Sequence, residues 1–148
     1  MQRLNLPEYT FRTKQESDKT LIFDALRKKW VTLTPEEWVR QNFIRYLVEE
    51  CSYPASTVGT EVGISVGGRM LRVDGVVYDR YGDVKLLLEF KAPSVPINEK
   101  VFSQSADYNT HIGAEYIIIS NGISHYCVHL SATGIEMLDA IPHFDSFS

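Results

Sequence analysis

The sequence predicts an α/β (α+β) fold in which helices flank a mixed central sheet. Two segments, near residues 35–50 and 98–112, repeat apolar residues at helical spacing. Between them lie three extended segments separated by glycine-containing turns, which predicts an antiparallel meander. The apolar run 116–119 then follows, as is typical of a strand buried on both faces. A helix between two strands implies a crossover, so this order of helix, three strands, helix and strand predicts a parallel pairing.

Size and composition indicate one domain. The chain has 148 residues, of which 44% are hydrophobic and 23% charged, so it can bury a core of its own. No apolar run approaches the roughly 20 residues that span a bilayer, and the first residues lack the long apolar segment of a signal peptide. Cys51 and Cys127 form neither a zinc pattern nor a disulfide framework. We therefore expect a cytoplasmic protein with no membrane partner.

Residues 1–34 read as an N-terminal extension that packs on the core, which we place at about residues 35–130. Phe11–Lys14 and Thr20–Asp24 flank a polar stretch and predict a hairpin, and Lys29–Leu33 predicts another short strand.

The first helix has clear boundary signals. Thr34 is a favourable N-cap, and Pro35 suits the first helical position. Thr34 and Glu37 together have the spacing of a capping box. At the other end, the Tyr53-Pro54 pair predicts that the helix has stopped, because a residue before proline avoids the α region.

The remaining elements follow from alternation and turn residues. The pair Asn121-Gly122 predicts a two-residue type I′ turn between two strands. Gly113 suits the residue after the second helix, which begins near Asn98. The predicted strands are Val58–Val66, Arg69–Asp79, Val84–Lys91, Glu115–Ser120, Ser124–Leu130 and Ile135–Leu138.

The central hairpin brings charged residues together. With an even-length loop centred on Tyr81-Gly82, paired residue numbers sum to 163, which places Asp74 opposite Glu89. Strand alternation puts Lys91 on the same face. A loop of odd length would shift the register by one and turn Asp74 to the other face. The charges also fit a plain ion-pair patch on an exposed strand, which contributes little to stability.

Two facing carboxylates repel each other unless a cation lies between them. Carboxylate oxygens are the ligands that Mg²⁺ (or Mn²⁺) prefers, so Asp74 and Glu89 predict a metal site, with the carbonyl of Phe90 as a further ligand. Lys91 would hold an attacking water or stabilise charge on a phosphate. This set suits phosphodiester hydrolysis.

These residues also resemble a known family. Asp74 followed by Glu89-Phe90-Lys91 resembles the PD-(D/E)xK nuclease signature, although Val73 stands in place of its proline. The match is closer to the N-terminal nuclease domain of type I restriction enzyme R subunits. It covers roughly residues 30–130 and rests on five blocks, namely Pro35–Gln41, Arg72–Val77, Glu89–Pro93, Gln104 with Tyr108-Asn109, and Ser120–Gly122.

The resemblance implies a restriction-endonuclease-like core and a Mg²⁺-dependent DNA endonuclease. By position, Asp74 and Glu89 look like the metal ligands and Lys91 like the catalytic lysine. Gln104 and Tyr108 match an auxiliary QxxxY motif expected to contact DNA. The alternative for Tyr108 is a core aromatic residue, and the alternative for Gln104 is an amide on the helix surface. Glu37 resembles an extra acidic group from the first helix, with a capping-box glutamate as its alternative.

The sequence contains no GxxxxGK[ST] loop, so we expect no motor activity from this chain. Its net charge of −4 argues against tight, autonomous DNA binding. The expected partners are DNA together with motor or specificity subunits, or further copies of this chain. A catalytically weak or inactive nuclease-fold module that binds DNA alongside partner subunits is the alternative function.

Overall fold

A six-stranded mixed sheet forms the centre of the computed structural model, which describes residues 1–147. The strand order is β4-β5-β6-β7-β8-β9. Only the β6–β7 pair is parallel, and helix α2 (Glu99–Ile112) connects these two strands. This confirms the predicted crossover. The strands are β4 (Val58–Val66), β5 (Arg69–Tyr78), β6 (Val84–Phe90), β7 (Tyr116–Ser120), β8 (His125–Ser131) and β9 (Gly134–Leu138).

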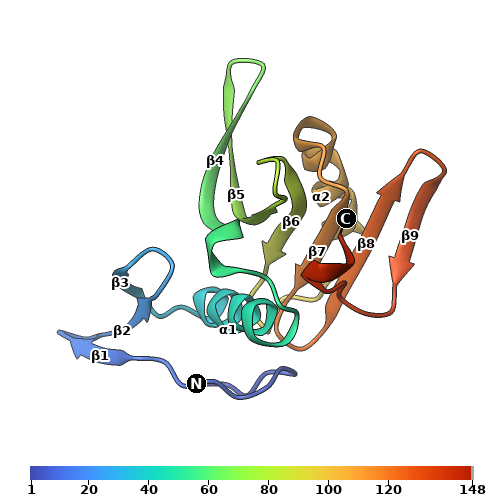
Figure 1. Cartoon of the computed structure of the whole chain (residues 1–148). Helices are drawn as coiled ribbons and strands as arrows, with labels where there is room; N and C mark the ends of the chain where they lie inside the picture. The colour runs from blue at the N-terminus through green and yellow to red at the C-terminus, as the bar shows by residue number, and fades with distance from the viewer. Residues whose placement is uncertain (148) are drawn as a thin grey trace.

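Two helices pack on opposite faces of this sheet (Figure 1). Helix α1 (Pro35–Glu50) buries Phe43 and Leu47 against Leu88, Phe90 and other residues of one face. Helix α2 packs on the other face, where the buried cluster consists of Val73, Val76, Leu87, Ala114, Ile117 and Ile119. The inner strands β6 and β7 are therefore buried on both sides, which explains their continuous apolar sequence.

The predicted boundaries of α1 are confirmed. The Thr34 side chain accepts a hydrogen bond from the backbone N–H of Glu37 at 3.0 Å, so Thr34 is the N-cap. The reciprocal half of the capping box does not form, because the Thr34 N–H donates to the Thr32 carbonyl and the Glu37 carboxylate binds other side chains. The helix ends at Cys51, before a short 3₁₀ turn, η1 (Ala55–Thr57).

The first 34 residues contact α1 and the loop between β7 and β8. Leu4 is buried in the core cluster of α1, and the indole N–H of Trp38 donates to the Gln2 carbonyl at 2.7 Å. The Asn5 N–H donates to the Gly122 carbonyl at 2.8 Å. The predicted hairpin and third strand form a separate antiparallel sheet of β1 (Thr13–Glu16), β2 (Lys19–Asp24) and β3 (Lys29–Thr32).

The hairpin of β5 and β6 has the predicted register, although its loop differs from the prediction. Gly75 pairs with Leu88 and Val77 with Leu86, and both pairs sum to 163. The register then shifts at Tyr78, which pairs with Val84, so the loop has an odd length and the even-loop prediction was wrong. An irregularity beside the loop absorbs the extra residue, so the pairs from Gly75 to Val77 keep the predicted register.

The turn between β7 and β8 also differs from the prediction. A type I′ turn needs positive φ at both central residues, but only Gly122 has one, at 87°. The Asn121 side chain instead accepts hydrogen bonds from the N–H groups of Ile123 and Ser124, at 3.0 and 2.8 Å. The result is a longer loop held by an asparagine side chain. After β9, the chain ends with a second 3₁₀ turn, η2 (Phe144–Ser146).

Within residues 1–147, neither helix has the length and apolar character needed to cross a membrane.

One buried amide joins the end of α2 to the start of β7, and it provides a test of this packing. Asn109 is 5% exposed, and its side chain both donates to the Ala114 carbonyl and accepts from the Ala114 N–H, each at 2.9 Å. Asn109→Ala leaves two buried backbone groups without partners, so we expect the free energy of unfolding to fall by about 2–3 kcal/mol. Urea denaturation measures this. Exposed Thr110→Ala is the control and should change stability by less than about 0.5 kcal/mol, and equal losses would contradict the assigned contact.

Candidate active site

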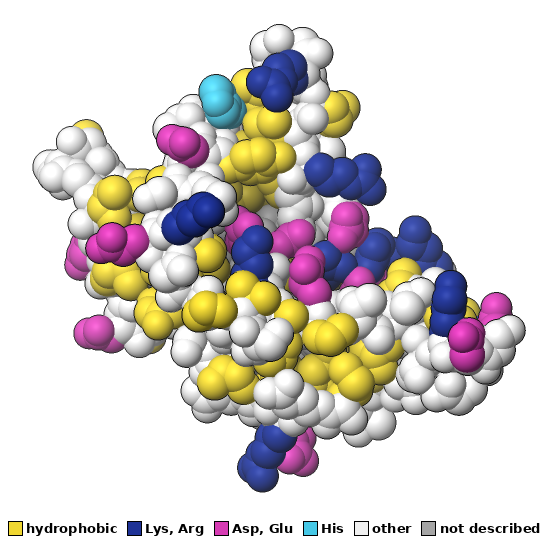
Figure 2. All heavy atoms as spheres, turned by 180° about the vertical axis from the view of Figure 1, so that it is seen from behind, with side chains coloured by type: hydrophobic (Ala, Val, Ile, Leu, Met, Phe, Trp, Pro, Cys, Tyr) yellow, Lys and Arg dark blue, Asp and Glu magenta, His cyan; other side chains and the backbone are white. Residues whose placement is uncertain are grey.

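A hollow of about 160 Å³ lies where the ladder between β5 and β6 ends, beside α2. Figure 2 shows acidic and basic side chains gathered in the middle of this face, below the projecting hairpin of β4 and β5. The structure brings four of the predicted site residues to the hollow. Its lining consists of Arg72, Val73, Asp74, Leu87, Leu88, Glu89, Gln104 and Tyr108.

Asp74 is held by the backbone of the neighbouring strand. Its Oδ2 accepts a hydrogen bond from the Phe90 N–H at 2.8 Å, while its Oδ1 lies 3.7 Å from Nη2 of Arg40. Burial raises the pKa of Asp74, and the charges of Glu89 and Glu61 raise it further, whereas the Phe90 N–H and Arg40 lower it. The carboxylate is therefore oriented but incompletely compensated in charge.

Glu89 and Lys91 form an ion pair at the end of β6. Glu89 Oε1 lies 3.1 Å from the Lys91 ammonium, and its Oε2 accepts a hydrogen bond from the Ser105 hydroxyl of α2 at 2.5 Å. Burial lowers the pKa of Lys91, but the contact with Glu89 and the charges of Asp74 and Glu36 raise it above its ordinary value overall. Lys91 thus stays protonated at neutral pH. Ser105 was not predicted as a site residue. Its position in the apolar stripe of the helix could have indicated a buried hydroxyl that binds a polar partner.

The two residues of the predicted auxiliary motif line the hollow from α2, but their surroundings differ. The Tyr108 hydroxyl donates to the Arg72 carbonyl at 2.8 Å, so this side chain fixes α2 against β5. Gln104 is exposed and lines both the hollow and a neighbouring groove. A DNA contact by Gln104 or Tyr108 stays a prediction.

The structure does not bring Glu37 to the hollow. Its carboxylate is buried, and Arg27 donates to it at 3.0 and 3.2 Å. Arg40 and Gln41 also donate to it, at 2.6 and 3.1 Å. Glu36, the neighbouring residue of α1, interacts electrostatically with the site. Burial and the charge of Asp74 raise the pKa of Glu36, while Arg40 and Lys91 lower it. Helical spacing alone did not distinguish these two neighbours.

Arg40 and Glu61 are further residues beside Asp74 that the sequence reasoning missed. Arg40 Nη2 lies 2.7 Å from Glu61 Oε1, and Arg72 lies 3.6 Å from the other oxygen of Glu61. Glu61 has a φ of 52° within strand β4. Such a left-handed conformation costs a non-glycine residue about 1–3 kcal/mol and is frequent at functional sites. No pattern in the sequence indicated it.

Negative charges outnumber positive ones near the hollow. Ion pairs near it involve four carboxylates (Glu36, Glu61, Asp74 and Glu89) and three cations (Arg40, Arg72 and Lys91), which leaves one negative charge in excess. Carboxylate oxygens suit Mg²⁺ or Mn²⁺. In the described part of the chain, no group of three His, Cys, Asp or Glu side chains is placed to hold a metal together. Asp74 and Glu89 are the two carboxylates that line the hollow, so a cation bound there would need backbone or solvent oxygens to complete its shell.

Comparison with known families gives one match. The model of the family described as "Type I restriction enzyme R protein N terminus (HSDR_N)" matches residues 35–142. This range begins with α1 and includes the whole six-stranded sheet and every residue that lines the hollow. No curated protein matches the chain.

The buried position of Glu37 predicts a large effect on stability. Glu37→Ala removes the carboxylate that Arg27 and Arg40 share, although Asp24 and Glu61 remain as their partners, so we expect a loss of about 2–3 kcal/mol in the free energy of unfolding. Chemical denaturation without added metal measures it. Glu49→Ala is a matched control on the same helix, because Glu49 pairs with Arg45 at 3.3 Å on the surface, and it should cost less than about 1 kcal/mol. Similar losses in both variants would contradict this assignment of Glu37.

Proposed function

The chain belongs to the family of type I restriction enzyme R protein N-terminal domains, and on this basis we propose that it is a metal-dependent DNA endonuclease domain with a restriction-endonuclease-like core. The observation that carries the proposal is the pair Asp74 and Glu89, which line one hollow, with the Lys91 ammonium 3.1 Å from Glu89. Two carboxylates suit Mg²⁺, and a neighbouring lysine can stabilise negative charge on a phosphate, so the three groups suit phosphodiester hydrolysis.

Asp74 and Glu89 would hold the cation, with the Phe90 carbonyl as a further ligand. When bound, Mg²⁺ or Mn²⁺ lowers the pKa of a bound water and neutralises charge on the phosphate. The protein supplies the orientation of the ligands. The Phe90 N–H fixes one oxygen of Asp74, and the Ser105 hydroxyl fixes one oxygen of Glu89. The second oxygen of Glu89 lies 3.1 Å from the Lys91 ammonium, and that of Asp74 lies 3.7 Å from Arg40.

Lys91 acts in this proposal as a cation and hydrogen-bond donor. Its raised pKa keeps it protonated at neutral pH, so it is poorly suited to act as a general base. A protonated lysine beside the metal ligands can stabilise the negative charge that develops on the phosphate oxygens.

The neighbouring groove offers a route for DNA to the carboxylates. It has a volume of about 740 Å³ and is lined by the β4–β5 hairpin and α2, including Arg69 and His111. Gln104 and Tyr108 line both the groove and the hollow, so the two are adjacent. The net charge of −4 is unfavourable for tight DNA binding. We therefore propose that motor or specificity subunits, or further copies of the chain, supply part of the DNA affinity.

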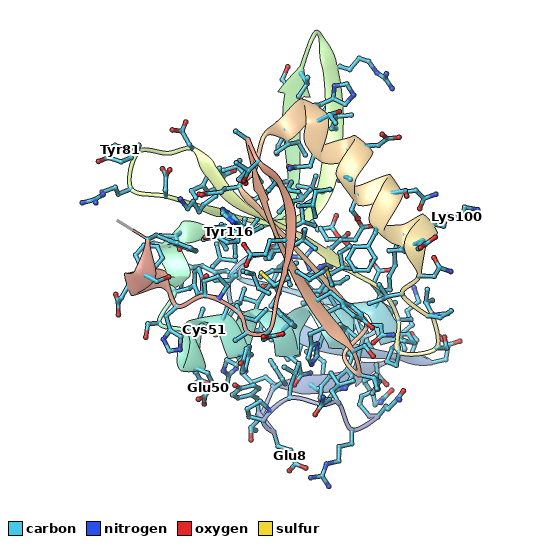
Figure 3. All side chains as sticks on the ribbon, turned by 90° about the vertical axis from the view of Figure 1, so that its right-hand side faces the viewer. Glu8, Glu50, Cys51, Tyr81, Lys100 and Tyr116 are labelled. Atoms are coloured by element: carbon cyan, nitrogen blue, oxygen red, sulfur yellow. The ribbon has the colours of Figure 1, made fainter. Side chains whose placement is uncertain are left out.

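A cleavage assay tests the proposal. Purified protein is incubated with supercoiled and linear DNA and with Mg²⁺ or Mn²⁺. We expect Asp74→Ala and Lys91→Ala to reduce the cleavage rate by about 100-fold or more, because the first removes a metal ligand and the second removes a cation that stabilises the transition state. Asp18→Ala and Lys100→Ala are matched controls and should keep the wild-type rate. Asp18 is exposed in the β1–β2 turn, and Lys100 points away from the body at the start of α2 (Figure 3).

Cleavage that persists in both Asp74→Ala and Lys91→Ala would rule out this site. If the wild-type protein cleaves no DNA with either metal and calorimetry detects no metal binding, the endonuclease proposal is wrong. The alternative of a DNA-binding module without catalysis would then be favoured.

A further inference from the structure

The guanidinium of Arg40 lies among four carboxylates at unequal distances. Its Nη1 is 2.6 Å from Glu37 Oε1, and its Nη2 is 2.7 Å from Glu61 Oε1 but 3.7 Å from both Asp74 Oδ1 and Glu36 Oε1. The side chain is 6% exposed, and its Nε has no hydrogen-bond partner. Arg40 is thus a buried cation that contacts Glu61 closely and Asp74 only at long range.

This difference in distance determines whether Arg40 occupies the second oxygen of Asp74. The 2.7 Å between Arg40 Nη2 and Glu61 Oε1 makes a close ion pair, whereas 3.7 Å exceeds hydrogen-bond distance. Among residues 1–147, the one hydrogen bond to the Asp74 carboxylate comes from the Phe90 N–H and reaches Oδ2. Oδ1 therefore remains free to accept another partner.

The backbone of β4 is distorted at the residue that holds Arg40. Glu61 is the one non-glycine residue with positive φ inside a strand of the described chain, since the other three, Ser17, Lys28 and Ser52, lie outside strands. Thr60 pairs with Gly75 and Val62 with Val73, so Glu61 lies across from Asp74 in a gap of the ladder. The distortion brings this carboxylate to Arg40 next to the candidate metal ligand.

We propose that Glu61 is a positioning residue that draws the Arg40 guanidinium away from Asp74 and so leaves Asp74 Oδ1 open to a divalent cation. The inference rests on the proposed function, since it concerns the same metal site. Without the negative charge of Glu61, Arg40 Nη2 moves toward the two carboxylates that lie 3.7 Å away, Asp74 and the more exposed Glu36. On Asp74 Oδ1 it becomes a tethered cation that competes with the metal. Glu61 thereby controls metal affinity without binding the metal.

Calorimetric titration with Mn²⁺ tests this effect. Glu61→Gln keeps the size of the side chain and removes its charge, and we expect metal affinity to fall about 10- to 100-fold, the range found for residues that support metal ligands. Glu61→Gly should lower affinity to the same extent, although it relieves the left-handed backbone and should give a higher Tm than Glu61→Gln. If Glu61 had a purely structural role, the variant with the higher Tm would also bind Mn²⁺ more tightly. Glu49→Gln, which removes a carboxylate from another arginine of α1, is the control and should bind Mn²⁺ like the wild type.

A second variant and a metal-free measurement complete the test. In Glu61→Gln/Arg40→Gln the competing cation is gone, so we expect most of the lost affinity to return. A crystal structure of metal-free Glu61→Gln should place Arg40 Nη2 within hydrogen-bond distance, about 3 Å, of Asp74 Oδ1. This structure also reports on Arg40 if the double variant does not fold.

Wild-type Mn²⁺ affinity in Glu61→Gln, or an Arg40 that stays away from Asp74 in its structure, would overturn the proposal. Failure of the wild-type protein to bind metal would instead refute the proposed function, and the metal-free distance separates these two results.

Discussion

The hydrogen bond from the Phe90 N–H to Asp74 joins two neighbouring strands where their ladder stops. Phe90 is 1% exposed and packs against Phe43 of α1 at 5.5 Å between ring centroids. Its strand is paired on both sides, antiparallel with β5 and parallel with β7. The core therefore fixes the Phe90 backbone, and that backbone fixes Asp74. The orientation of a polar group at the surface thus depends on apolar packing beneath it.

A buried chain of alternating charges connects the N-terminal sheet to this site. Asp24 accepts hydrogen bonds from Arg27, which contacts Glu37, which in turn binds Arg40. Removing charges from water is costly, so the attraction within such a chain is largely offset and adds little to net stability. The chain instead holds its side chains in one defined arrangement. The family match begins at residue 35, yet Asp24 and Arg27 lie before it. The first 34 residues therefore contribute charge partners to the site as well as packing.

Much of the architecture could be predicted from the sequence because it depends on local patterns. Thr34 and Pro35 marked the start of α1, and the pairing sum of 163 gave the register of the hairpin from Gly75 to Val77. The predictions were less successful where contacts between distant segments decide. Glu37 is bound by Arg27, which lies ten residues earlier in the chain. Glu61, with its left-handed backbone, pairs with Arg40 of another element. Neither relation leaves a periodic signal in the sequence.

Two contacts of α2 have a consequence for the open end of the hairpin. Ser105 binds Glu89 at the end of β6, and Tyr108 binds the Arg72 carbonyl of β5. Both contacts lie beyond the Gly75–Leu88 pair, the last pair of the ladder between β5 and β6. Helix α2 therefore cross-links the two strands in the part of the hairpin where their backbones no longer pair.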